Sequence, residues 1–114
     1  MSTLPHLSVG GLSIPLDEEG FLERLEDWNH DSATALAMAE GIELSDAHWE
    51  VINTVREFYR EFEHAPANRA LVKYVKIKLG ADKGRSIYLL KLFPDRPALL
   101  VAKIAGLPRP DNCF

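Results

Sequence analysis

Sulfur is scarce in this sequence, which has 114 residues and a single cysteine, Cys113. One thiol can form neither an internal disulfide nor a two-cysteine redox pair. A run of about 18 apolar residues, the length of a membrane-spanning helix, is also missing. The first residues lack the basic stretch and apolar run that mark a secretory signal. These absences predict a cytoplasmic protein with no membrane span, whose thiol stays reduced.

Metal-ligand patterns are missing as well. The histidines His6, His30, His48 and His64 are not spaced with a second ligand, and the lone cysteine has no CxxC partner. The glycines and cations of "GADKGRS" lack the spacing of a phosphate-binding loop. We therefore expect no metal site and no bound cofactor.

The charge is divided unevenly along the chain. Residues 1–64 carry fourteen acidic and three basic side chains, a net −11, whereas residues 65–114 carry three acidic and ten basic ones, a net +7. Two halves that attract each other on folding would explain this division. A basic face that meets an acidic partner or RNA is the less favoured explanation, because helical surfaces carry charge in any case.

Hydrophobic periodicity predicts a mainly α fold of the α+β class, with about five helices and a small N-terminal β-hairpin. Turn signals at "GG" and "DEEG" place the two hairpin strands near 11–16 and 20–23. Ser45 is a good N-cap for the second helix, and Pro97 suits the first turn of the last one. Apolar residues at helical spacing, ended by glycine or proline, place the helices near 28–40, 46–65, 68–79, 86–93 and 97–105.

The third and fourth helices form a basic part of the chain with the outline of a helix-turn-helix motif. Arg69, Lys73 and Lys76 share one stripe of the third helix, which we expect to be exposed. A helix that reads DNA needs side chains that reach base edges, whereas "SIYLLKLF" is nearly all apolar. The fourth helix is therefore interpreted as a core helix, and sequence-specific DNA binding is the less favoured alternative.

The C-terminal stretch "LPRPDNCF" has no helical periodicity and carries the only thiol. Pro108 and Pro110 stiffen it and remove hydrogen-bond donors, and the polar residues just before Cys113 do not favour its burial. At about 3.1 Å per residue, the six residues that end at Cys113 could extend roughly 20 Å. We therefore divide the chain into a single domain, 1–106, and a flexible C-terminal arm, 107–114.

One thiol on a mobile arm has few chemical uses. A protease-like cysteine needs a fixed histidine and an oxyanion hole, which a mobile terminus cannot provide. Carrying a group between two active sites is feasible, and sulfur is the natural cargo. The Cys113 thiolate would take the outer sulfur of a donor persulfide and yield it to an acceptor. Arg109 favours the thiolate, and Asp111 and the terminal carboxylate oppose it; a structural adaptor with an idle thiol is the alternative.

The chain resembles the DsrC/TusE family of small sulfur-carrier proteins over nearly its whole length. The matching stretches include "ELSDAHWEVINTVREFYREF", "PANRALVKYVKIKLG" and "YLLKLFPDRPA". The most specific is the terminus "KIAGLPRPDNCF", in which a helix leads into G-L-P-[KR]-P-x-x-C-x. The resemblance implies an α-helical fold with an N-terminal hairpin, a helix-turn-helix-like part and a flexible C-terminal arm. It also implies that Cys113 is the catalytic, sulfur-carrying residue.

One position separates two forms of this family. Members that serve dissimilatory sulfite reductase carry a second cysteine eleven residues before the terminal one, where this chain has Ala102. The resemblance therefore implies the single-cysteine, TusE-type form, a sulfurtransferase that acts as a persulfide carrier without independent turnover or cofactor. Such a carrier takes sulfur from a complex of the TusBCD type. It passes the sulfur to a tRNA thiolase of the MnmA type for 2-thiouridine synthesis, with tRNA as a candidate third component.

The resemblance also implies docking residues. The family's "RxLVK" stretch appears here with Arg69 and Lys73, and together with Arg109 these are the candidate partner-docking residues. Two alternatives stay open: a DsrC-like sulfur-trafficking protein of another sulfur pathway, and a DNA-binding regulatory protein.

Overall fold

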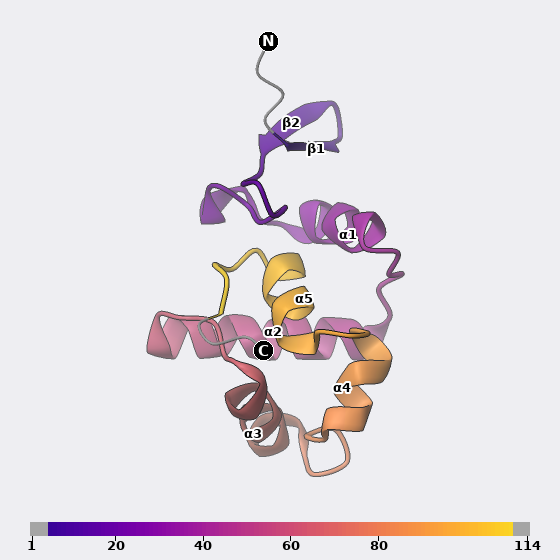
Figure 1. Ribbon diagram of the computed structural model, residues 1–114, viewed down its shortest axis with the longest axis vertical. Helices are drawn as coiled ribbons and strands as arrows, with labels where there is room; N and C mark the ends of the chain where they lie inside the picture. The colour runs from indigo at the N-terminus through magenta and orange to yellow at the C-terminus, as the bar shows by residue number, and fades with distance from the viewer. Residues whose placement is uncertain (1–4, 111–114) are drawn as a thin grey trace.

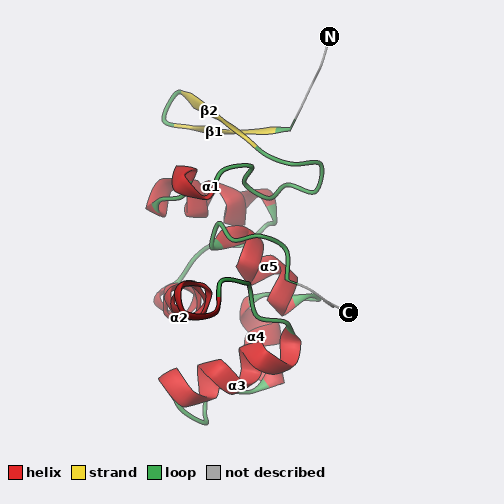
Figure 2. Cartoon of the chain, turned by 90° about the vertical axis from the view of Figure 1, so that its left-hand side faces the viewer, coloured by secondary structure: helices red, strands yellow, loops and turns green. Residues whose placement is uncertain are grey.

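The computed structural model describes residues 5–110 and confirms a mostly helical fold with an N-terminal hairpin. The hairpin lies at one end of the molecule and helix α3 lies towards the other (Figures 1 and 2). In chain order the elements are β1 (His6–Val9), β2 (Leu12–Pro15), the 3-10 helix η1 (Leu25–Asp27), α1 (His30–Ala39), α2 (Asp46–Phe62), α3 (Asn68–Leu79), α4 (Ser86–Leu92) and α5 (Pro97–Ile104).

The hairpin lies earlier in the chain than the sequence predicted. Strand β2 falls inside the expected 11–16, but it pairs with β1, and the expected partner at 20–23 contributes only an isolated bridge between Leu16 and Leu22. The turn is Gly10–Gly11, where both residues have positive φ, at 55° and 84°. Two-residue turns of this kind match the twist of paired strands, which is why "GG" and not "DEEG" closes the hairpin.

Two helices are shorter than predicted. Helix α1 begins at His30 because the Asn29 side chain accepts a hydrogen bond from the Ser32 N–H at 2.8 Å, so Trp28 precedes the helix. Helix α2 begins after the Ser45 N-cap as expected, but it ends at Phe62, since Glu63 adopts a left-handed conformation with φ of 59°. Both limits are set by single residues at the helix ends.

Helix α5 occupies the centre of the fold. It contacts α1, α2, α3 and α4, and its side chains Val101, Ala102 and Ile104 are fully buried. Figure 1 shows it between α1 and α2, with the chain leaving α5 towards the C-terminus. The end of the chain therefore starts from the best-packed helix.

Helix α4 is not the core helix that its composition predicted. Leu89 is fully buried, but Ile87 is 57% exposed and Leu90 is 41% exposed. Phe62, the last residue of α2, is also exposed. A short helix at the edge of the fold covers the core with one face only, so apolar composition alone overstated its burial.

Candidate functional site

Cys113, the predicted sulfur carrier, lies outside the residues that the structure describes. The described residues closest to it in sequence follow helix α5, and side chains from other parts of the fold hold them. We call residues 105–110, which connect α5 to the last four residues, the C-terminal root. Its contacts show where the described part of the chain ends and what holds it there.

The root begins with a tight helix end. The N–H of Leu107 donates to the carbonyl oxygen of Ala102 at 2.9 Å, and Gly106 has a positive φ of 73°. This is the pattern by which a glycine satisfies the last carbonyls of a helix. A Cβ at Gly106 would lie 2.6 Å from the indole Cγ of Trp28, so glycine is needed for its small size as well as for its conformation.

Two side chains from the N-terminal half hold the same helix end. Trp28 Nε1–H donates to the carbonyl oxygen of Ile104 at 2.9 Å, and Arg56 Nη1–H donates to that of Ala105 at 2.6 Å. The Arg56 guanidinium carbon lies 3.8 Å from the centre of the Trp28 ring. Burial, and secondarily the charge of Arg60, lowers the pKa of Arg56. The positive charge of Arg56 at the C-terminal end of α5 is favourable for the helix dipole.

The root packs against the body of the protein. Leu107 belongs to the hydrophobic core, and Pro110 is buried, whereas Pro108 and Arg109 are exposed. Figures 1 and 2 both place residues 107–110 beside the loop that joins α2 to α3. The packed part of the chain thus extends through Pro110, past the predicted boundary at 106. The flexibility of the arm stays a prediction, because residues 111–114 lie outside the described range.

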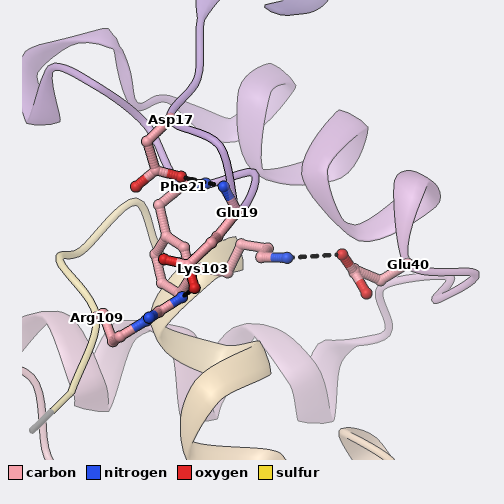
Figure 3. A network of polar contacts seen from close by, with 6 residues as sticks. All are labelled: Asp17, Glu19, Phe21, Glu40, Lys103 and Arg109. Atoms are coloured by element: carbon pink, nitrogen blue, oxygen red, sulfur yellow. Dashed lines mark hydrogen bonds and ion pairs between the residues drawn. The ribbon is translucent and has the colours of Figure 1, made fainter. Parts of the chain in front are cut away.

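Arg109 is held by residues of the N-terminal part (Figure 3). Its guanidinium forms an ion pair with Glu19, and the guanidinium carbon lies 5.6 Å from the centre of the Phe21 ring. Lys103 Nζ lies 5.4 Å from the same ring and pairs with Glu40 at 3.0 Å. The side chain that was predicted to dock a partner is therefore engaged within the chain.

Arg69 and Lys73 lie together on the exposed side of α3. They line a shallow groove of about 390 Å³ with Val72, Lys76 and their neighbours, Asn68 and Ser86. Within residues 5–110, neither of the two forms a salt bridge. Since Arg109 pairs with Glu19, the structure assigns the three predicted docking residues to two separate places.

Sequence reasoning missed the residues that hold the root. None of Trp28, Arg56 and Glu19 was among the candidate site residues. Trp28 bonds a carbonyl 76 positions away and Arg56 one 49 positions away. No local pattern signals pairings at such separations; the only available signal was that Gly106 ends the last helix.

Other kinds of site find no support in the described part of the chain. Between residues 5 and 110, no three His, Cys, Asp or Glu side chains come together as metal ligands. None of the helices in that range combines the length and apolar composition needed to cross a bilayer.

Comparison with known proteins supplies the relatives of this chain. The family described as DsrC like protein matches residues 8–114. A Haemophilus influenzae protein named Sulfurtransferase TusE homolog is 51% identical over 108 residues, which cover 95% of this chain and 99% of that protein. Sulfurtransferase TusE of Salmonella typhimurium is 52% identical over 104 residues, covering 91% and 95%.

Solved structures of proteins named DsrC have a similar fold. The NMR structure of Allochromatium vinosum DsrC has a TM-score of 0.88 at 43% identity and covers 98% of this chain and 100% of that one. The crystal structure of the oxidized γ-subunit of dissimilatory sulfite reductase (DsrC) from Archaeoglobus fulgidus has a TM-score of 0.83 at 39% identity, covering 96% and 100%.

Proposed function

This chain belongs to the DsrC-like family, and we propose that it is a cytoplasmic sulfur carrier that relays persulfide sulfur to a tRNA thiolase for 2-thiouridine synthesis. The observation that carries the proposal is the position of the sole thiol, next to last in a chain about half identical to proteins named sulfurtransferase. Ala102, where a second thiol would stand, is a fully buried methyl group on α5. A chain with one thiol can hand sulfur on but cannot lock it in an internal bond.

The relay consists of two thiol exchanges. In the first, the Cys113 thiolate attacks the outer sulfur of a persulfide on a donor of the TusBCD type, forms Cys113–S–SH and releases the donor thiolate. In the second, a thiolate of the MnmA-type thiolase attacks the outer sulfur and releases Cys113 as thiolate. No net oxidation occurs, so no cofactor is required. In this proposal the segment that carries the thiol begins at the root, and the partners supply the active sites.

Arg69 and Lys73 are proposed to dock a partner, with tRNA as a candidate third component. Their groove is continuous with a second one, of about 260 Å³, that shares Asn68, Val72 and Ser86 with it and adds apolar side chains of α4. A groove with an apolar floor and a basic rim suits a protein segment that carries acidic and apolar residues.

Charge reversal on α3 tests this docking surface. We expect Lys73→Glu to lower kcat/KM for sulfur transfer from the donor complex about tenfold at low salt, with a smaller effect at high salt, because the attraction is screened. Lys78→Glu is the matched control: it makes the same charge change on the same helix, but Lys78 does not line the groove. Equal losses in the two variants would argue against a docking role for Lys73.

Isotope transfer tests the relay itself. The protein is loaded with heavy sulfur on Cys113, separated from the donor and mixed with thiolase, ATP and unmodified tRNA. We expect heavy 2-thiouridine in the tRNA, in an amount limited by the loaded carrier, because the sulfur passes through the thiol. Loaded carrier that keeps its sulfur in the presence of active thiolase would contradict this function and favour another sulfur pathway.

A further inference from the structure

We propose that Glu19 and Phe21 hold Arg109 and thereby limit how far Cys113 can reach. The contact between these three residues is called the Arg109 latch. In this proposal Glu19 and Phe21 are positioning residues, which act on the thiol through the C-terminal root. The inference rests on the proposed function in one respect: the thiol whose reach is set is the one that carries sulfur.

Two side chains contact the Arg109 guanidinium in the latch, one through its charge and one through its aromatic ring. Glu19 supplies the carboxylate, and the face of Phe21 lies within cation–π range of the Arg109 carbon at 5.6 Å. Phe21 is 3% exposed, so its ring is fixed in the core. Lys103 approaches the same ring and is itself held by Glu40 (Figure 3).

Hydrogen bonds around Asp17 hold the turn that presents Glu19. Asp17 Oδ1 accepts hydrogen bonds from the backbone N–H of Glu19 at 2.8 Å and of Phe21 at 2.9 Å. The Asp17 N–H in turn donates to the Phe21 carbonyl at 2.8 Å. Such an Asx-type turn orders both residues before Arg109 reaches them. The latch thus joins the turn that carries Glu19 to Arg109, the exposed residue between the two prolines of the root.

Opening the latch changes the reach of the thiol by a factor of two. With the root held through buried Pro110, Cys113 is three residues beyond the last fixed point, a span of at most about 11 Å. When Arg109 and Pro110 leave the body, the next fixed point is buried Leu107, and six residues give about 22 Å.

The latch can open readily because its ion pair is accessible. The side chains of Arg109 and Glu19 are 46% and 54% exposed, and ion pairs of this kind contribute little to stability. A carboxylate on a partner can therefore replace Glu19. This reconciles the internal contact with a docking role: Arg109 becomes available to a partner at the moment when the thiol gains reach.

A nitroxide on Cys113 measures the reach directly. Because Cys113 is the only cysteine, the label attaches at one site without further substitution. We expect Glu19→Gln to raise paramagnetic relaxation enhancement at backbone amides more than about 15 Å from Pro110 roughly two- to fivefold. Glu18→Gln is the control, since Glu18 forms no ion pair within residues 5–110. High salt should also raise the relaxation enhancement at these amides in the unmodified chain, because it screens the ion pair.

A charge swap separates a latch from a simple docking residue. Arg109→Glu should extend the reach, and the double variant Glu19→Arg with Arg109→Glu should restore it, because the pair is re-formed with reversed signs. Unchanged enhancement in Glu19→Gln, or no restoration in the double variant, would overturn the latch. The readout involves no sulfur transfer, so it stands apart from any failure of the relay.

Discussion

Replacing Cys113 with serine is expected to lower 2-thiouridine in tRNA by on the order of 100-fold or more in cells that have this chain as their only carrier. The reason is chemical: a serine hydroxyl is not ionised at neutral pH and cannot hold sulfur as a persulfide, whereas a thiolate can. The substitution replaces a single heavy atom, the sulfur of Cys113, with oxygen. The measurement is the ratio of 2-thiouridine to uridine in digested tRNA.

A neighbouring substitution controls for disturbance of the chain end. Phe114→Leu keeps the thiol and changes only the adjacent apolar side chain, so 2-thiouridine should stay within about twofold of the unmodified level. Thermal unfolding of both variants reports whether the fold is retained. Cells with Cys113→Ser that still make normal 2-thiouridine would show that the sulfur does not pass through this residue.

Gly106→Ala should destabilise the fold by about 2–4 kcal/mol. Placing alanine at a positive φ costs roughly 1 kcal/mol, and forcing its methyl group into the Trp28 ring adds about 1–3 kcal/mol. Since the ring also bonds the Ile104 carbonyl, its displacement should weaken the end of α5 and shift the root. The measurement is the free energy of unfolding from urea denaturation, together with the rate of sulfur transfer.

Gly41→Ala separates the cost of placing alanine at a positive φ from the cost of the clash with Trp28. Gly41 has φ of 75°, nearly the 73° of Gly106, but an added Cβ there would have nothing within 4 Å. Its loss of stability should therefore stay near 1 kcal/mol, with sulfur transfer unchanged. If the two alanine variants lose equal stability, the close approach of Trp28 to the root contributes nothing and the small size of Gly106 is irrelevant.

The sequence predicted the helices because they depend on local signals. Periodic apolar residues, the Ser45 cap and the glycine ends located four of the five helices within a few residues, and α2 at its start. The hairpin was misplaced because "GG" and "DEEG" are both turn signals, and only pairing across the strands distinguishes them. Composition overstated the burial of α4, since exposure depends on what a neighbouring helix covers.

The contacts of the C-terminal root could not be predicted in the same way. Trp28, Arg56 and Glu19 act on the root from positions at least 49 residues away, and their partners in two cases are backbone carbonyls with no sequence signature. Arg109 was expected to face a partner because nothing in its local sequence indicates Glu19. The role of Cys113 is therefore a prediction from the sequence, whereas the contacts of the C-terminal root became visible only in the fold.

Intact-protein mass spectrometry tests the role of Cys113 directly. The chain is incubated with a persulfide donor, freed of excess donor without reductant, and weighed beside Cys113→Ser treated in the same way. The expected result is a gain of about 32 Da, one sulfur atom, located by fragmentation on Cys113 and removed by a thiol reductant. No gain, or an equal gain in the serine variant, would contradict the sulfur-carrier function of this residue.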